Sequence, residues 1–326
     1  MDGIQWVADA ALAQPLEPHE AEGFTEENAQ QEWEALLHHL QQTQDPPRPP
    51  FSTRYLDEWA ARFDVREEIR PGKFQAGTAG TTPPVSIERP FHAGRFPVTN
   101  LEFMRFVLDT GYRTEAECGD GGIVYFSGIG TEEPSDPHRV STPTLEPLAQ
   151  ACWWRPDGSP DALKHRACHP VTLISWSDAQ AYCRWKSAQT GRTVRLPREV
   201  EWEYLASNLG ALTGELPWVA DDITRFCNIE ESGLGATTPV DHFPTHALTA
   251  NILDLFGNVY EWVQDGATPA GRSPELEYHF VRGGSFLTPI QQLARWRRLP
   301  FLTGYRTSFI GFRTVSDPGA EAPAPS

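Results

Sequence analysis

Hydrophobic side chains recur at helical spacing in the first 64 residues. Two groups follow an i, i+3, i+4, i+7 pattern: Trp33, Leu36, Leu37 and Leu40, and then Tyr55, Leu56, Trp59 and Phe63. Thr25 is placed to cap the first helix and Ser52 to start the second, and the proline-rich run 45–50 separates them. Two short amphipathic helices cannot bury these faces on each other alone. This N-terminal arm, residues 1–64, is therefore expected to pack on the rest of the chain or on a partner.

From residue 65 to 316 the pattern changes to short apolar runs between turns. It predicts strands at 85–87 and 94–98, a helix capped by Thr99 or Asn100 that ends at Gly111, a helix from Ser177 to Gly191, and another from Pro197. Residues 113–168 are rich in Gly, Pro and Asp and are expected to be mostly loops. The pattern indicates an α+β domain with few regular elements. The Pro- and Ala-rich tail, 317–326, is expected to be disordered.

Composition limits the classes of function. The chain has 39% apolar residues, 29 Pro, 26 Gly and a net charge of −17, which indicates a folded, turn-rich protein that repels nucleic acid and anionic membranes. The first 16 residues have neither the basic cluster nor the apolar core of a signal peptide, and no run of 18 apolar residues occurs. Five cysteines without CxxC spacing indicate reduced thiols. We expect a cytoplasmic protein.

Four segments in order carry a resemblance to a known family. They read GRFPVTNLEF at 94–103, HPVTLISWSDAQAYCRW at 169–185 with RLPREVEWEY at 195–204, LFGNVYEW at 255–262, and VRGGS at 281–285 with IGFR at 310–313. WWRPDG at 153–158 is a softer fifth match. Together they resemble the formylglycine-generating (sulfatase-modifying factor) family. The resemblance implies an irregular α+β fold, related to the C-type lectin domain and held together by calcium and by buried Trp and Arg side chains.

Two calcium sites are implied by this resemblance. The first comprises the side chains of Asp254 and Glu261 with the carbonyls of Gly257 and Val259, and two acids around a glycine turn suit calcium's preference for six to eight oxygen ligands. The alternative is that Asp254 caps a turn and Glu261 pairs with an arginine. The second site begins at Asn228 and Ile229, and Ser232 stands where the family has an acid, so weaker binding is expected there.

The family's own reaction depends on residues that this chain lacks. Formylglycine generation in the family uses two cysteines near the C-terminus that bind copper(I), and soft Cu(I) needs thiolates. The last cysteine here is Cys227, and Cys183 lies in a predicted helix, where it is expected to be a packed core thiol. The sequence therefore excludes formylglycine generation.

The C-terminal segment is instead most similar to the ergothioneine- and ovothiol-type sulfoxide synthases. In those iron enzymes this domain supplies substrate-binding arginines and aromatic residues, and a separate helical domain supplies most of an HxxxHxE iron site. No such pattern occurs in this chain, and the 64-residue arm is too short for that helical domain. The chain thus resembles the substrate-binding half alone.

Several arginines and aromatic residues of this segment are candidates for a ligand-binding surface, because guanidinium groups bind carboxylates in a bidentate manner. They are Arg295, Trp296, Arg297, Arg298, Phe301, Tyr305 and Arg306. The alternative is that some pair with acids inside the protein, as we expect for Arg282 and Arg313.

Three hypotheses for function follow. In the first, which we favour, the chain is a non-catalytic member that binds a small molecule with carboxylates or a protein partner. In the second, it is an oxygen- or iron-using enzyme akin to the sulfoxide synthases, which assembles its metal site from scattered histidines or uses a separate helical iron-binding partner. In the third, it forms a new oxidase site from some of four histidines, His165, His169, His242 and His246. The oligomeric state is left open.

Overall fold

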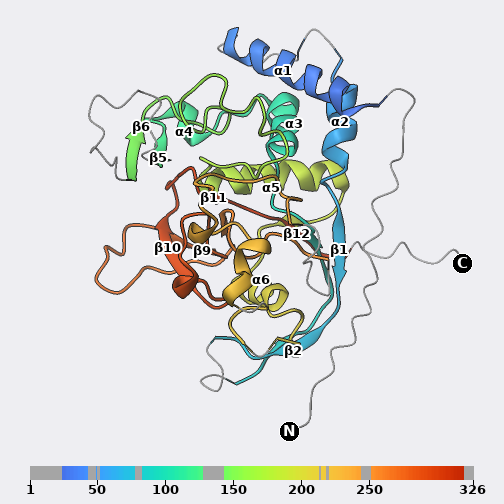
Figure 1. Cartoon of the computed structure of the whole chain (residues 1–326). Helices are drawn as coiled ribbons and strands as arrows, with labels where there is room; N and C mark the ends of the chain where they lie inside the picture. The colour runs from blue at the N-terminus through green and yellow to red at the C-terminus, as the bar shows by residue number, and fades with distance from the viewer. Residues whose placement is uncertain are drawn as a thin grey trace, which may run out of the picture.

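The computed structural model describes residues 24–42, 49, 52–77, 83–127, 143–212, 214–217, 220–243 and 251–318 (Figure 1). Within them the α-helices are α1 (Glu26–Gln42), α2 (Arg54–Ala61), α3 (Asn100–Thr110), α4 (Glu115–Cys118), α5 (Trp176–Thr190) and α6 (Glu199–Ala206). Short 3-10 helices are η1 (Ala220–Arg225), η2 (Glu230–Ser232) and η4 (Ile290–Gln292). The strands are β1 (Arg66–Ile69), β2 (Gly72–Phe74), β3 (Val85–Ile87), β4 (Phe91–Gly94), β5 (Gly122–Phe126), β6 (Thr144–Leu148), β7 (Val194–Arg195), β8 (Tyr260–Trp262), β9 (Tyr278–Arg282), β10 (Arg298–Leu302), β11 (Ile310–Gly311) and β12 (Val315–Ser316).

The strands form small sheets joined by long ordered loops. One four-stranded sheet has the order β1-β4-β12-β7 and another the order β10-β9-β8-β11, while β2 pairs with β3 and β5 with β6. The pairing of β8 with β11 is parallel and that of β8 with β9 antiparallel. The predicted α+β class with few regular elements is confirmed. The relation to the C-type lectin domain stays a prediction.

Local capping signals set the starts of the helices. At α3 the Thr99 side chain accepts a hydrogen bond from the Glu102 amide while the Glu102 carboxylate accepts one from the Thr99 amide. Ser175 and Asp178 repeat this capping box at α5, so the prediction that Ser177 caps this helix is wrong by two residues. The strand predicted at 94–98 is also displaced. β4 ends at Gly94, and Pro97 has no N–H for a ladder.

The helices of the N-terminal arm pack on the domain (Figure 1). Trp33 and Leu36 of α1 are fully buried in the main core cluster, and the Trp33 indole N–H donates to the carbonyl of Leu163 at 2.9 Å. The sequence predicted that the arm packs on the rest of the chain or on a partner protein. The described part of the arm packs on the domain of the same chain. Residues 1–23 of the arm and 319–326 of the tail lie outside the described residues, so the expected disorder of the tail stays a prediction.

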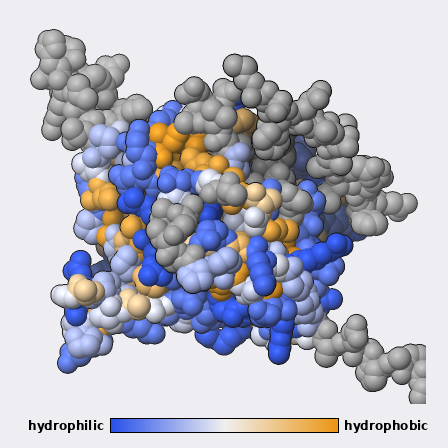
Figure 2. Space-filling model, turned by 90° about the horizontal axis from the view of Figure 1, so that it is seen from below, coloured by the Kyte–Doolittle hydropathy of each residue, from blue (hydrophilic) through white to orange (hydrophobic). Residues whose placement is uncertain are grey.

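No described helix is long and apolar enough to cross a bilayer. The face drawn in Figure 2 is covered mainly by hydrophilic residues, with smaller hydrophobic areas between them. This agrees with a chain that carries 44 acidic and 27 basic residues.

Candidate functional site

Arg295, one of the seven residues predicted to bind a ligand, is fully buried. Its guanidinium lies 2.8 Å from the Glu203 carboxylate and donates to the carbonyl of Gly214 at 3.0 Å. The predicted surface position of Arg295 is therefore wrong. The guanidinium forms an internal ion pair because α6 places Glu203 directly opposite it.

The other arginines of that group also contact the protein itself. Arg298 is half-exposed and pairs with Glu199, which also binds Arg282 at 2.8 Å. Arg282 further contacts Glu203 at 3.0 Å, so two acids of α6 hold the three arginines. Arg297 donates to the Gln292 side chain at 3.0 Å. Arg282 and Arg295 are buried in this network, whereas Arg298 joins it from the surface and Arg297 bonds to Gln292 instead.

The remaining predicted ligand residues separate into two places. Arg306 donates to the carbonyls of Gly121 and Gly304 and lies 2.7 Å from Asp120, so it joins the β5 region to the C-terminal segment. Phe301 and Tyr305 stack with centroids 4.6 Å apart and are half-buried. Half-buried Trp296 lies under the Arg295 guanidinium. The structure thus does not gather the seven residues on one surface.

Glu261, a predicted calcium ligand, has both carboxylate oxygens occupied. They accept hydrogen bonds of 2.7 Å from the guanidinium of Arg313, and the same carboxylate accepts the Trp202 indole N–H at 2.7 Å. Glu261 and Arg313 are both essentially inaccessible to solvent. Glu261 is thereby an ion-pair partner, and in this arrangement its carboxylate does not fit the role of a calcium ligand.

Asp254 fits a cation better. Desolvation by the surrounding protein raises the pKa of this carboxyl to about 7, and its side chain accepts the amide N–H of Asn258 at 2.6 Å. Asn258 also accepts from Asn228 at 3.4 Å, so one side chain joins the two predicted calcium regions. Asn228 Oδ1 is buried without a hydrogen-bond partner among the described residues, whereas the carbonyl of Ile229 accepts the Ser232 amide.

Sequence reasoning missed Asn258. This residue is fully buried with φ of 56°, it follows Gly257 with φ of 81°, and its side chain exchanges hydrogen bonds with the main chain of Thr238. An Asn next to Gly is a signal for this left-handed turn conformation, which Asn and Gly tolerate. The carbonyls of Gly257 and Val259 flank the turn. Calcium here stays a prediction, carried by Asp254 and main-chain oxygens.

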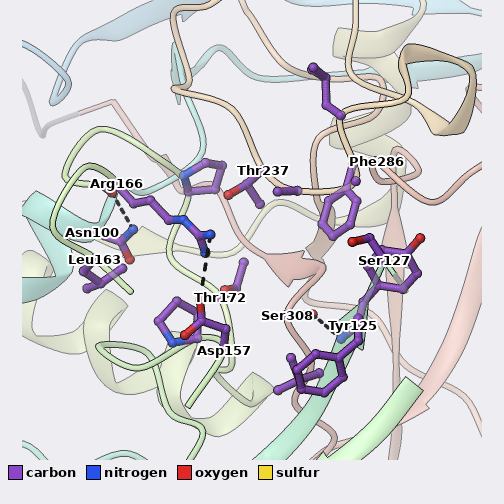
Figure 3. A pocket seen from close by; sticks show the side chains of 17 residues that line it. Asn100, Tyr125, Ser127, Asp157, Leu163, Arg166, Thr172, Thr237, Phe286 and Ser308 are labelled. Atoms are coloured by element: carbon purple, nitrogen blue, oxygen red, sulfur yellow. Dashed lines mark hydrogen bonds and ion pairs between the residues drawn. The ribbon is translucent and has the colours of Figure 1, made fainter. Parts of the chain in front are cut away.

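A pocket of about 270 Å³ lies elsewhere, between the α3 N-terminus, β5 and the loops after them (Figure 3). Three of the motifs that carry the family resemblance contribute to its lining, and a residue next to a fourth does so as well. Asn100 belongs to the first of them, Asp157 to the softer fifth and Thr172 to the second, and Phe286 directly follows VRGGS. The complete lining comprises Asn100, Val124, Tyr125, Phe126, Ser127, Pro156, Asp157, Leu163, Arg166, Pro170, Thr172, Leu234, Gly235, Ala236, Thr237, Phe286 and Ser308.

One end of the pocket, the charged end, contains Arg166, Asp157 and Asn100 (Figure 3). The Arg166 guanidinium is 3.9 Å from Asp157, which is beyond hydrogen-bonding distance, so that carboxylate does not saturate its donors. Asn100 donates to the Arg166 carbonyl at 2.8 Å, and its Oδ1 is buried with no partner among the described residues. The Arg166 guanidinium thus has donors left for an anion, and the Asn100 oxygen beside it is buried without a donor among the described residues.

The other end, the aromatic end, contains Tyr125 and Phe286, whose rings meet edge to face with centroids 5.8 Å apart (Figure 3). Ser308 accepts the Tyr125 amide at 3.0 Å and so fixes β5 beside the C-terminal segment. Phe126 and Leu234 line the pocket too and are 36% and 51% exposed, which makes its rim apolar. A flat apolar group suits this end.

None of the five cysteines lines the pocket. Burial raises the pKa of Cys152 and of Cys183 to about 12, and it raises the pKa of Cys168 and of Cys227 as well. These four thiols are therefore protonated at neutral pH and are poor metal ligands. Cys183 is fully buried in α5, as expected of a packed core thiol.

Three of the four histidines considered for an oxidase, His165, His169 and His242, lie in the described residues, and they are not part of a metal-binding group of three. His169 bonds to the Thr237 hydroxyl at 2.9 Å, and burial, its largest influence, lowers its pKa to about 3. His246 lies outside the described residues. Within the described ranges no three His, Cys, Asp or Glu side chains group as a metal site.

Comparison with known proteins matches residues 61–318 to the sulfatase-modifying factor enzyme 1-like domain. The formylglycine-generating enzyme of Bos taurus is 31% identical over 256 residues, covering 70% of this chain and 66% of that protein. The inactive C-alpha-formylglycine-generating enzyme 2 of Mus musculus is 30% identical over 248 residues, covering 71% of this chain and 76% of that protein. The chain thus spans slightly less than two thirds of the bovine enzyme's length.

A more distant relative and a solved structure extend the comparison. The hercynine oxygenase of Mycolicibacterium thermoresistibile is 28% identical over 220 residues, covering 60% of this chain and 44% of that protein. The structure of PvdO from Pseudomonas aeruginosa superposes with a TM-score of 0.56 at 23% identity, covering 78% of this chain and 94% of that one. At this identity the structural likeness concerns the fold alone.

Proposed function

The chain belongs to the family of the sulfatase-modifying factor enzyme 1-like domain, and from this premise we propose that it binds a small molecule and does not generate formylglycine. The observation that carries the proposal is a pocket with a charged and an aromatic end and no thiol in its lining. The similarity to a relative described as inactive is in keeping with it.

The proposed ligand is a small carboxylate with an aromatic or flat apolar body. Arg166 would bind the carboxylate, while Tyr125 and Phe286 would contact the apolar body. A pocket of about 270 Å³ is at the lower limit of ligand sites, which begin near ~300 Å³, so the ligand is smaller than a typical drug. The proposal moves the ligand from the C-terminal arginines, of which Arg295 and Arg298 pair with α6 acids, to this pocket.

Replacing Arg166 by Ala is expected to weaken binding of 3-phenylpropionate about tenfold or more, because a hydrogen bond to a charged group contributes roughly 1.5–3 kcal/mol. Binding of 3-phenylpropan-1-ol, which has the ring but no charge, should change by less than about threefold. Isothermal titration calorimetry measures both ligands on both proteins.

The matched control for this variant is Arg192→Ala, which removes an exposed arginine at the end of α5. It should leave both affinities unchanged. Equal weakening by the two variants would attribute the effect to net charge and refute a role for Arg166. Conversion of a cysteine-bearing peptide to its aldehyde by the purified protein, seen by mass spectrometry, would refute the proposal as a whole.

A second candidate function rests on the similarity to hercynine oxygenase. Under it the chain is the substrate-binding part of an iron- and oxygen-dependent enzyme of the sulfoxide synthase type, acting on thiol and histidine-type substrates, with iron held by a separate partner. The same pocket would then hold the substrate. Stoichiometric iron in purified protein, or oxygen uptake on adding a helical iron-binding protein, would favour this candidate.

Metal analysis also tests the calcium prediction. Glu261 is paired with Arg313, so Asp254 is the one carboxylate left for calcium at the predicted site. Because calcium affinity depends on the charge of the ligands, we expect a Kd of about 10⁻⁴ to 10⁻³ M in chelator-treated protein. Asp254→Asn should abolish this binding in a calcium titration. The control Asp241→Asn, at a neighbouring exposed acid, should leave it within about twofold. Calcium binding that survives Asp254→Asn would mean that the ion binds elsewhere.

The cytoplasmic location stays a prediction.

A further inference from the structure

Helix α1 makes three hydrogen bonds to a single loop of the domain. The side chains of Gln41, Trp33 and Gln30 donate to the carbonyls of Pro160, Leu163 and Lys164, at 2.8, 2.9 and 2.7 Å. Because Trp33 and Gln41 lie three and eleven positions after Gln30, the three donors lie along one side of the helix. The helix lies on the outside of the domain, packed on α2 (Figure 1). We call residues 159–169 the α1-bound loop.

The second half of the α1-bound loop is held by α3. The amides of Asn100 and Leu101 donate to the carbonyls of His169 and Ala167 at 3.0 and 3.1 Å. The Asn100 side chain donates to the carbonyl of Arg166 at 2.8 Å. The carbonyls that α1 binds therefore lie within 160–164, and those that α3 binds lie within 166–169.

This loop has no regular secondary structure of its own. It is a series of turns in which the amides of Ala162, Lys164, Arg166 and His169 each donate to a carbonyl three residues earlier. Such a segment has few internal hydrogen bonds and opens at low cost unless outside contacts hold it. Its Leu163 and Arg166 line the pocket, so the position of the loop decides where the guanidinium lies.

We infer that α1 positions the charged end of the ligand pocket through its hydrogen bonds to the α1-bound loop. This inference rests on the proposed ligand-binding function and adds to it a residue outside the matched domain, because α1 precedes residues 61–318. Trp33 is a positioning residue. It is fully buried and contacts the carbonyl of Leu163, whose side chain faces the pocket, and it does not itself line the pocket.

Two variants weaken this contact without removing the helix. Trp33→Phe keeps an aromatic ring in the core and removes the N–H donor. The double variant Gln30→Ala with Gln41→Ala removes the other two donors. Gln31→Ala is the matched control, because Gln31 is an exposed glutamine on the same helix and the same substitution is made.

The readouts are amide hydrogen exchange of residues 160–169 and the affinity for 3-phenylpropionate. We expect both test variants to accelerate exchange in this loop about three- to tenfold and to weaken binding by a similar factor. Binding of 3-phenylpropan-1-ol should change less, since it does not use Arg166. The control should match wild type in all three measurements. A general loss of stability in a test variant would instead accelerate exchange throughout the chain.

Two results would overturn the inference while the proposed function stands. In one, exchange of the loop is unchanged in both test variants. In the other, exchange accelerates and the affinity for 3-phenylpropionate is unaltered. If the wild-type protein itself fails to bind 3-phenylpropionate, the proposed function is wrong and this inference is wrong with it. This failure is distinguishable, because it is seen before any residue of α1 is changed.

Discussion

Replacing Arg295 by Glu is expected to lower the free energy of unfolding by at least about 3–5 kcal/mol, because breaking a buried ion pair leaves an uncompensated charge. Arg295 is 0% exposed and pairs with Glu203 at 2.8 Å, so the variant would bury two facing carboxylates. For a domain of this size the melting temperature should fall by on the order of 10 °C. Urea denaturation and calorimetry measure these changes.

Arg298→Glu is the matched control for this variant. Arg298 lies three residues later and contacts Glu199 from the surface, with 54% of its side chain exposed. Exposed pairs contribute at most about 1 kcal/mol, so the control should lose little stability. Similar losses in the two variants would contradict an internal role that is specific to Arg295. A stable Arg295→Glu protein with weakened ligand binding would restore the surface role predicted from the sequence.

The spacing of arginines along the chain could not separate internal from ligand-binding roles. The partners of Arg282, Arg295 and Arg298 are Glu199 and Glu203, which lie some 80 to 100 residues earlier. The antiparallel pairing of β9 with β10 places Arg282 opposite Arg298, and this register depends on the whole sheet. Only the tertiary arrangement shows that two acids on consecutive turns of α6 hold all three guanidinium groups.

Features encoded within a few residues were predicted more closely. The helix bearing Trp33 starts after Thr25, whose hydroxyl accepts the Asn28 amide, and α3 ends at Gly111 with φ of 67°. Each signal is a short-range hydrogen bond or a backbone preference that the sequence carries by itself. The start of α5 was misplaced because two serines, Ser175 and Ser177, both precede a helical pattern.

The pocket could not be predicted because its lining comes from segments far apart in sequence. Asn100 and Phe286 are separated by 186 positions along the chain and line the same cavity. The motifs identify these segments as parts of the family framework. Their order along the chain does not show which of them meet at the pocket. Arg166 lies outside every motif. A single basic residue in a predicted loop does not by itself indicate a ligand site.

Replacing Glu261 by Gln is expected to destabilise the protein by about 3–5 kcal/mol, since Arg313 would keep its charge in a fully buried place without a carboxylate. Glu58→Gln, which breaks the half-buried Arg54–Glu58 pair of α2, should cost at most about 1 kcal/mol. Urea denaturation of both variants, each with chelator and with excess calcium, measures the two losses.

The calcium dependence of the Glu261→Gln loss decides between the two roles of Glu261. If Glu261 is the ion-pair partner of Arg313, the variant loses the same stability with and without calcium, because the guanidinium is always present in the chain. A calcium ligand would show the larger loss only when calcium is present, because a ligand ion stabilises the fold by mass action. With both oxygens of Glu261 bonded to Arg313 at 2.7 Å, we expect equal losses, and a loss confined to calcium-containing buffer would contradict the ion pair.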